Sequence, residues 1–378
     1  MKKLLIVTTV PQTISNFLFP FAAHFRQQGW QVDAMSYQIS TDVECVNRFD
    51  RVWDVEWSRN PFDPRNLLSA PKTIREIIIS AEYDIVHVHT PVAAFVTRFA
   101  LKDLRHHLKT KIIYTAHGFH FYKGGNLLKN IAFINLEKLA SKWTDYIVTI
   151  NQEDRAAVIE HGLVELDHTR YMPGIGVNLR DNDRDTIPEA AVTKIRQELD
   201  ISESTPLLLS LAEFNPNKRH ADTINAFAKL ARTDVHLALA STGPLLQKMQ
   251  QLAAELGVAS RVHFLGWRSD IPVLMKTANA NILVSAREGL PRSVMESLAA
   301  ELPTIGTNIR GTQDLLTGGY GLLIDVGDVV GLTTAMTWIL DRPQEAKDMA
   351  KRGRAHVAAY DLNQIIRLHE ELYTEAIV

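Results

Sequence analysis

The chain has 378 residues, of which 46% are hydrophobic and 22% charged, and its formal net charge is −2. Because one hydrophobic core rarely serves more than about 300 residues, this length predicts two domains. The near-neutral charge gives no general attraction to nucleic acid, so we expect no nucleic-acid partner. A single cysteine, Cys45, excludes an intramolecular disulfide and a thiolate metal cluster, and it suits a reducing compartment.

The first ten residues, Met1–Val10, combine two lysines with an apolar run, as signal peptides do. The run is short, is broken by Pro11 and lacks a small-residue cleavage site, so a buried first strand explains it better. No apolar stretch reaches the roughly 18 residues that span a bilayer. We therefore expect a cytoplasmic protein, with peripheral contact to the inner face of the membrane left open.

In the first half, runs rich in Val and Ile alternate with amphipathic stretches, which is typical of βαβ units and a parallel sheet. The predicted strands are Leu4–Val10, Val32–Ser36, Asp84–His89, Lys111–Ala116 and Asp145–Ile150. The predicted helices are Phe17–Gln28, Lys72–Ala81, Val92–Leu108 and Leu127–Lys142.

The segment Arg98–Lys142 is strongly basic, with nine Lys/Arg against two acids, a local charge of 9 − 2 = +7. Solvated helix faces explain such a charge run as well as a surface that faces anionic lipid or a diphosphate does. The sequence leaves both interpretations open.

The periodic pattern breaks near Met172–Glu189 and then restarts, so we place the domain boundary there, with domains at 1–175 and 176–359. Asp181 and Asp183 have the spacing of an Asp-x-Asp metal site, but an exposed interdomain loop is the better interpretation, because no strand precedes them. The second set of predicted strands is Pro206–Glu213, Val235–Ser241, Arg261–Gly266, Ala280–Ser285, Pro303–Thr307 and Gly321–Ile324. The predicted helices between them are Arg219–Ala231, Leu245–Leu256, Ile271–Thr277 and Ser293–Ala300.

The fold class expected is therefore α/β, with two tandem Rossmann-like domains. Open parallel sheets bind ligands at the carboxyl ends of their strands. Two such edges that face each other form a cleft, so we expect a site built from loops after strands in both halves.

The most informative segment runs from Ser285 to Glu296, directly after a predicted strand. It contains a Gly-Leu-Pro turn and enters a helix near Pro291 or Arg292. A helix start after a parallel strand offers free N–H groups and a positive dipole, which bind phosphate. Glu288 lies before the turn and Glu296 inside the helix, where an ordinary surface role is the alternative to holding ribose hydroxyls.

This segment, with Glu288 and Glu296 separated by seven residues, resembles the signature of family 4 glycosyltransferases of the GT-B fold. Other motifs recur in the family's order over essentially the whole chain, namely Asp84–His89, Thr115–His120, Lys218 before a helix and Phe264–Trp267. The most similar subset builds bacterial exopolysaccharide, capsule or lipid-linked glycans. The resemblance implies that the last segment, 360–378, is a helix that crosses back to the first domain, and that the connection is a hinge.

The resemblance also implies roles for single residues. Glu288 would contact the donor sugar, Glu296 the ribose, and Lys218 the diphosphate, where it would replace the metal of other transferase folds. The diphosphate would lie on the segment Gly289, Leu290, Pro291, Arg292 and Ser293, largely on its backbone N–H groups. Arg219 could assist Lys218 or could shield the start of the following helix.

Two further residues gain roles from the resemblance. His117, at the end of a predicted strand, would hydrogen bond to the transferred sugar, and Arg268 lies in the loop that holds the base, largely through backbone groups. A structural role is the alternative for His117. His87 and His89 share one face of their strand, but no third metal ligand accompanies them at a sensible spacing, so we expect structural or supporting roles.

The chain departs from the family pattern at two places. Glu213 stands where family members usually carry an arginine, which puts a two-cation diphosphate clamp in doubt; Arg219, Arg287 or Arg292 could substitute. The loop after the first strand, Thr8–Thr13, lacks the usual glycine pair, so the close approach that glycine permits is not expected there.

The implied reaction is retaining transfer of a sugar from a nucleoside diphosphate, such as UDP, to an acceptor hydroxyl, with no metal and no cofactor besides the donor. The acceptor would be a glycan or a lipid-linked glycan. A lipid-linked acceptor would explain the basic segment and the apolar surface candidates Trp53, Trp57 and Phe62, for which packing inside the fold is the alternative. The alternatives are a nucleotide-sugar 2-epimerase and a non-catalytic binding subunit; an NAD enzyme is disfavoured, because no Gly-x-Gly-x-x-Gly follows the first strand.

Overall fold

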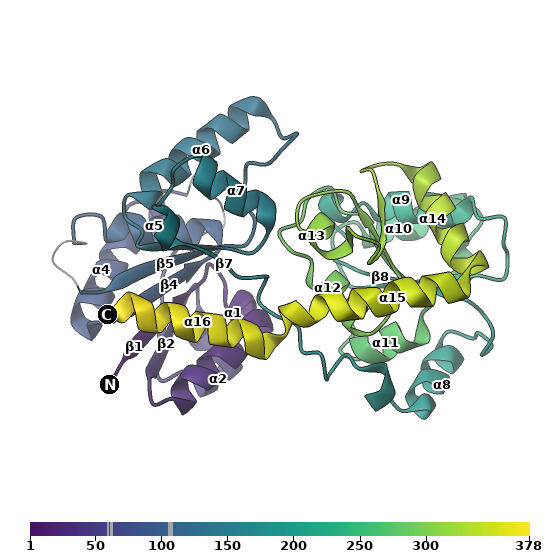
Figure 1. Ribbon diagram of the computed structural model, residues 1–378, viewed down its shortest axis with the longest axis horizontal. Helices are drawn as coiled ribbons and strands as arrows, with labels where there is room; N and C mark the ends of the chain where they lie inside the picture. Colours follow the sequence, from purple (N-terminus) through teal and green to yellow (C-terminus); the bar gives the residue numbers. More distant parts are fainter. Residues whose placement is uncertain (59, 61–62, 105–108) are drawn as a thin grey trace. The chain divides into compact units, whose positions relative to one another are not determined.

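The computed structural model describes residues 1–58, 60, 63–104 and 109–378. The chain forms two compact units, and each is described by itself (Figure 1). The first unit comprises Met1–Ile175 together with Asn363–Val378, and the second comprises Gly176–Leu362. The first unit therefore contains both ends of the chain.

The first unit is built on a seven-stranded parallel sheet with the order β3-β2-β1-β4-β5-β6-β7. Its strands are β1 (Lys3–Val7), β2 (Gln31–Ser36), β3 (Val52–Asp54), β4 (Ile85–His89), β5 (Lys111–Ala116), β6 (Tyr146–Thr149) and β7 (Thr169–Tyr171). Its helices are α1 (Pro11–Phe17), α2 (Phe19–Gln27), α3 (Val43–Arg48), α4 (Ser69–Ala81), α5 (Pro91–Ala100), α6 (Leu127–Ser141), α7 (Gln152–Glu160) and α16 (Leu362–Ile377). Helices cover both faces, as a parallel sheet requires.

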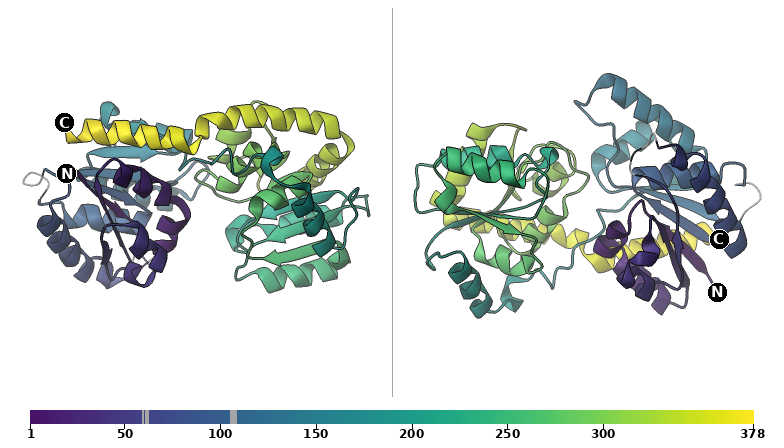
Figure 2. Two further views of the ribbon diagram at one scale, coloured as in Figure 1. Left: turned by 90° about the horizontal axis from the view of Figure 1, so that it is seen from below. Right: turned by 180° about the vertical axis from the view of Figure 1, so that it is seen from behind.

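Alternation along β4 shows how the two faces differ. Val86 and Val88 point into a core shared with α4 and α5, through residues such as Ile74. His87 points to the opposite face, where its ring meets Tyr373 of α16. Tyr373 also packs on Phe25 of α2, with ring centroids 4.8 Å apart. The C-terminal helix α16 thus packs on the first sheet, along which it runs in Figure 2.

The second unit is built on a six-stranded parallel sheet with the order β10-β9-β8-β11-β12-β13. Its strands are β8 (Leu207–Leu211), β9 (His236–Ala240), β10 (Val262–Gly266), β11 (Ala280–Leu283), β12 (Thr304–Thr307) and β13 (Leu322–Ile324). Its helices are α8 (Glu189–Glu198), α9 (His220–Ala228), α10 (Leu246–Glu255), α11 (Ile271–Thr277), α12 (Arg292–Ala299), α13 (Thr312–Leu316), α14 (Val329–Asp341) and α15 (Pro343–Val357). One face packs on α9, α10 and α14, and the other on α8, α11, α12 and α15.

The structure corrects several predicted elements. The expected helix Phe17–Gln28 is two helices, α1 and α2, which meet at Leu18, with Pro20 in the first turn of α2. The expected helix Val92–Leu108 ends at Ala100, and its last four residues lie outside the described part of the chain. The short strands β3 and β7 were not predicted. No helix within the described ranges combines the length and the apolar character needed to span a membrane.

Candidate functional site

The strand order of the second sheet reverses next to β8, which has β9 on one side and β11 on the other. Ligands of open α/β sheets bind at such a switch point, outside the carboxyl ends of the strands. The loops that leave β8 and β11 at this point carry Lys218 and Glu288. The strand order therefore indicates a binding site at the loops after β8 and β11, which are also the loops that carry the sequence motifs.

Main-chain and amide hydrogen bonds join these two loops. The Asn215 side chain accepts from the N–H groups of Asn217 and Lys218, at 3.0 and 3.2 Å, which closes a short 3-10 turn over Pro216–Lys218. The Asn217 amide donates to the carbonyl of Arg287 at 2.9 Å, and the Ala286 N–H donates to the carbonyl of Asn217 at 2.8 Å. The loops thus hold each other in place before any side chain of the motif is considered.

Lys218 and Glu288 form an ion pair at this junction, with 2.5 Å between Lys218 Nζ and Glu288 Oε1. The two side chains are only 22% and 12% exposed, so water screens the pair less than it screens a surface pair. The pair places an ammonium group beside the turn that leads into α12. This is the position where a cation can neutralise a phosphate bound at the helix start.

Helix α12 begins at Arg292 with Pro291 as its N-cap, and no side chain caps its first turn. The first N–H groups of a helix have no partner within the helix and carry its positive dipole end. Val294 and Leu298 are fully buried on the inner face of α12 and fix its direction. The start of α12 therefore has the features of an anion-binding helix end.

Glu296, one turn into α12, has a carboxylate that is 16% exposed and accepts from Arg292 Nε at 2.7 Å. Burial raises its pKa, and the bond with Arg292 offsets this only in part. A shielded carboxylate with an exposed partner can exchange that partner for ligand hydroxyls. Arg292 is thus the partner of this shielded carboxylate, and the role of Glu296 toward a ribose stays a prediction.

A third loop, after β12, supports the turn, and none of its residues is among the predicted site residues. The Arg310 Nε donates to the carbonyl of Glu288 at 3.2 Å. Gly311 has φ 75°, and a Cβ there would lie 1.9 Å from the carbonyl oxygen of Gly289. Only glycine permits this approach of two backbones. A glycine shortly after a predicted strand was the signal available in the sequence.

Arg219 and Arg268, the two arginines proposed to contribute to donor binding, each form ion pairs with acidic residues of their own unit. Arg219 forms an ion pair with Asp222 at 2.5 Å at the start of α9, in line with the alternative that it shields this helix start. Arg268 follows the edge strand β10 and pairs with Glu198 and Asp270 at 2.5 and 2.6 Å. These bonds raise its pKa further, so the charge of Arg268 is already compensated.

Glu213, which stands where an arginine was expected, is exposed and accepts from Asn215 Nδ2 at 3.0 Å. It therefore helps to hold the Asn215 turn that carries Lys218. Lys218 is the basic side chain that the structure brings against Glu288. The doubt about a two-cation clamp stays.

His117 lies in the first unit, after β5, and is joined to a row of buried histidines. Its Nε2 lies 3.0 Å from His89 Nδ1, and the His89 ring stacks on His87 with centroids 4.2 Å apart. His87 in turn forms hydrogen bonds with Tyr373 and Thr115, and the ring centroids of His87 and His369 lie 5.7 Å apart. His117 and His369 thus adjoin the pair His87 and His89, for which structural or supporting roles were expected, and His89 directly orients His117.

Burial keeps this histidine cluster, His87, His89, His117 and His369, uncharged. It lowers the pKa of His117 and of His369 to about 4 and the pKa of the other two well below the ordinary value. His117 is therefore neutral at physiological pH and can donate or accept a hydrogen bond without carrying charge.

The histidine cluster predicts loss of stability in acid. Between pH 6.5, where an unfolded histidine titrates, and pH 4, the unfolded chain binds more protons than the folded chain, so stability falls as pH falls. Each such histidine costs up to about 1.4 kcal/mol per pH unit. Urea unfolding followed from pH 7 to 4.5 should show this slope, and His369→Phe should flatten it while His168→Asn does not. A free energy of unfolding that is constant over this range would contradict the assignment.

Other candidates lie elsewhere. In the described part of the chain, one group of three potential metal ligands occurs, Glu165, Asp167 and His168, and none of them is a predicted site residue. Asp183 caps a short turn through its side chain, which agrees with the loop interpretation of that segment. Trp57 is buried and donates to the Thr9 carbonyl, so of its two alternatives the structure shows packing inside the fold.

Of the other two apolar candidates, Trp53 is half-buried and donates to the hydroxyl of Tyr83 at 2.8 Å. Phe62 lies outside the described residues. The basic segment is not one surface either, because Arg98 is fully buried and pairs with Glu137.

Comparison with known proteins gives two family matches and several relatives. The family described as Glycosyl transferases group 1 matches residues 191–356, and Glycosyltransferase Family 4 matches residues 14–174. EpsD of Bacillus subtilis (strain 168), a glycosyltransferase by name, is 32% identical over 99% of this chain and 96% of its own length. The UDP-Gal:alpha-D-GlcNAc-diphosphoundecaprenol alpha-1,3-galactosyltransferase of Escherichia coli is 22% identical over 84% of this chain and 80% of its own.

Among solved structures, HepE of Anabaena in complex with UDP matches with a TM-score of 0.79 and 20% identity, over 99% of this chain and 100% of that one. This likeness concerns the fold. Together with the relationship to EpsD over nearly the whole chain, it confirms the expected fold class and family. The chain belongs to the group 1 and family 4 glycosyltransferases and has their GT-B fold of two Rossmann-like domains.

Proposed function

We propose that the protein is a retaining glycosyltransferase that takes its sugar from a UDP-sugar, with the diphosphate at the start of α12. The observation that carries this proposal is the Lys218–Glu288 ion pair at the switch point of the second sheet, directly before an uncapped helix start. Such a site offers one cation and several backbone N–H groups to a diphosphate. The carboxylates of Glu288 and Glu296 offer acceptors to the sugar and ribose hydroxyls.

In the proposed reaction, the bond between the anomeric carbon and the diphosphate oxygen breaks, a bond to the acceptor oxygen forms, and the proton of the acceptor hydroxyl passes to the leaving diphosphate. Negative charge develops on the leaving diphosphate, and Lys218 and the dipole of α12 stabilise it there. His117, uncharged, would hydrogen bond to the transferred sugar and orient it. We propose that this charge stabilisation needs neither a metal nor a cofactor besides the donor.

The nature of the donor and acceptor is supported by the relatives. HepE has been solved in complex with UDP, and the E. coli relative is named for transfer from UDP-Gal to a sugar on a diphosphoundecaprenol carrier. We therefore propose a glycan hydroxyl, carried on a lipid diphosphate, as the acceptor, and bacterial surface polysaccharide or lipid-linked glycan synthesis as the process.

A nucleotide panel followed by a turnover assay tests this proposal. UDP should raise the melting temperature by several degrees, and more than ADP or GDP does, because a ligand stabilises in proportion to its affinity. With the matching UDP-sugar and a glycan-diphosphate lipid, UDP should be released in the presence of EDTA, and NMR of the product should show the donor's anomeric configuration.

The other outcomes separate the alternatives. Epimerised donor formed without acceptor would establish the 2-epimerase reaction instead. Nucleotide binding without transfer or donor hydrolysis would indicate a binding subunit. A melting temperature that no nucleotide changes would contradict the proposed site itself.

A further inference from the structure

The solvent-facing side of α6 is unusually apolar. Leu128, Ala132 and Leu139 are spaced by four and seven residues and so share one face, with Ile131 and Leu136 on either side of it. Leu128 is 77% exposed, and Ile131, Leu136 and Leu139 are between 43% and 48% exposed. A helix on the surface of a water-soluble domain normally places polar residues there.

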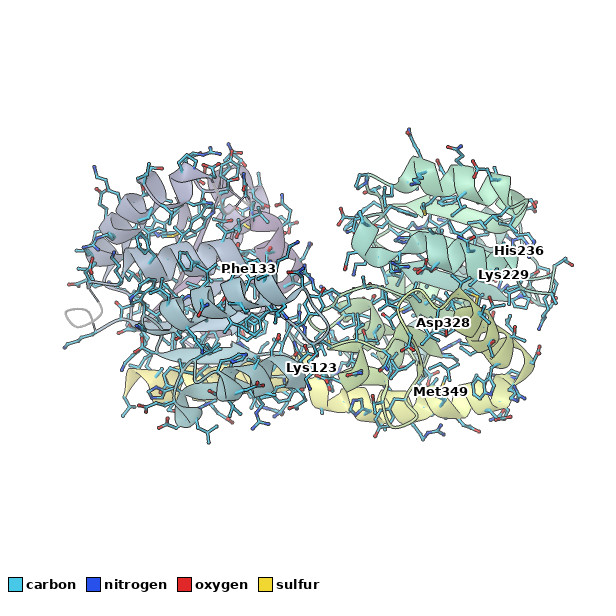
Figure 3. All side chains as sticks on the ribbon, turned by 90° about the horizontal axis from the view of Figure 1, so that it is seen from above. Lys123, Phe133, Lys229, His236, Asp328 and Met349 are labelled. Atoms are coloured by element: carbon cyan, nitrogen blue, oxygen red, sulfur yellow. The ribbon has the colours of Figure 1, made fainter. Side chains whose placement is uncertain are left out.

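The opposite side of α6 is also occupied, so the exposed leucines do not result from an inverted helix. Phe133 and Ile134 pack against the core of the first unit, and Figure 3 labels Phe133 on this helix. Glu137 reaches inward to the buried Arg98, with 3.2 Å between its carboxylate and the guanidinium. The helix is apolar on both sides, and only one side has a partner in the described structure.

Lysines border the exposed apolar stripe. At 3.6 residues per turn, Lys138 lies next to Ile131 on one edge of the stripe, and Lys129 lies next to Leu136 on the other. Lys123 precedes the helix and Lys142 follows it, and all four lysines are exposed. Glu137, which points inward, is the one acid between residues 123 and 142. An apolar stripe edged by lysines is the pattern of a helix that lies in a membrane interface.

We propose that α6 docks on an anionic lipid bilayer, with its leucines among the headgroups and its lysines on the lipid phosphates. Charge complementarity selects this occupant. A second copy of the chain would pack α6 against α6 about a twofold axis, and the same lysines would then face each other. An anionic bilayer offers an apolar layer and negative charge at the same depth.

The docking surface is joined to the loop that carries His117. The His120 ring contacts Phe133 of α6, with centroids 5.0 Å apart, and the Asn130 amide donates to the carbonyl of Tyr122 at 2.9 Å. A bilayer-bound α6 therefore holds this loop close to the lipid surface. If the proposed function is right, a lipid-linked acceptor meets His117 there; membrane docking itself does not depend on that function.

Vesicle sedimentation of the full chain tests the proposal. Vesicles of phosphatidylcholine with about 30% phosphatidylglycerol should bind the protein, and pure phosphatidylcholine should bind much less. The double variant Leu128→Ser/Leu139→Ser should lower the partition coefficient at least about tenfold. Lys129→Glu/Lys138→Glu should lower it more, since each lysine contributes about fivefold, and binding should weaken in high salt.

Matched controls lie in the second unit. Val330 on α14 is 67% exposed, and Val330→Ser should sediment like the wild type, as should the α15 double variant Lys347→Glu/Lys351→Glu. Circular dichroism and the melting temperature of each variant verify that it is folded, so a failed transferase assay would not affect the conclusion. Equal binding to neutral vesicles, unchanged binding of both α6 variants, or a dimer in solution that Leu128→Ser/Leu139→Ser dissociates would each overturn the proposal.

Discussion

Replacing Lys218 with alanine should lower kcat about 100-fold or more, with a melting temperature close to that of the wild type. Lys218 Nζ lies 2.5 Å from Glu288 at the turn into α12, and the lysine is the cation that we propose pairs with the diphosphate. Removing one preorganised group that stabilises developing charge typically costs about 100- to 1,000-fold in turnover. The measurement is UDP release at saturating donor and acceptor.

The matched control for this experiment is Lys229→Ala. Lys229, labelled in Figure 3, directly follows α9 in the same unit, at the opposite end of this helix from Lys218, and it is exposed. Its removal should leave kcat within about twofold. Lys218→Ala turnover equal to that of the wild type would remove the lysine from the reaction, and equal losses in both variants would point to a general effect on the fold.

Replacing Glu296 with glutamine should raise the Kd for UDP about tenfold or more without weakening the fold. Glutamine keeps the shape of the side chain but loses the charge, which would otherwise strengthen hydrogen bonds from ribose hydroxyls. Since burial already disfavours the charged form and raises the pKa of Glu296, its neutral replacement should not lower the melting temperature of the free protein. Calorimetric titration with UDP measures the effect.

Arg292→Ala separates this role from a structural one. If Glu296 serves only to pair with Arg292, both variants should weaken nucleotide binding equally. If it holds the ribose, Arg292→Ala should leave more affinity than Glu296→Gln does, because the carboxylate remains. A UDP affinity unchanged in Glu296→Gln would show that the carboxylate does not contact the nucleotide.

The sequence predicts the sheets of this protein well, because their strands are buried and rich in Val, Ile and Leu. Lys111–Ala116 was predicted with the bounds that β5 has, and all eleven predicted strands have counterparts. The strands that were missed, β3 and β7, have three residues each at the edges of the sheet. Such short segments show no apolar period that distinguishes them from loops.

The site could be predicted only in part. Chain order placed Lys218 and Glu288 after strands, and the Gly-Leu-Pro turn indicated where α12 begins. The contact between Lys218 and Glu288 joins residues 70 positions apart, and so depends on strand order rather than on local pattern. The approach of Gly311 to the Gly289 carbonyl also joins residues that are distant in the sequence, as do the contacts of the histidines around His89. Periodicity predicted α6, but it could not show that the side with Leu128 packs against none of the residues that the structure describes.

A crystal structure with UDP would show whether the diphosphate binds at the start of α12. We expect the β-phosphate to accept from Lys218 Nζ and from backbone N–H groups at the start of α12, and the ribose hydroxyls to donate to Glu296. UDP bound at another edge of the second sheet, with Lys218 still paired only to Glu288, would contradict this proposal.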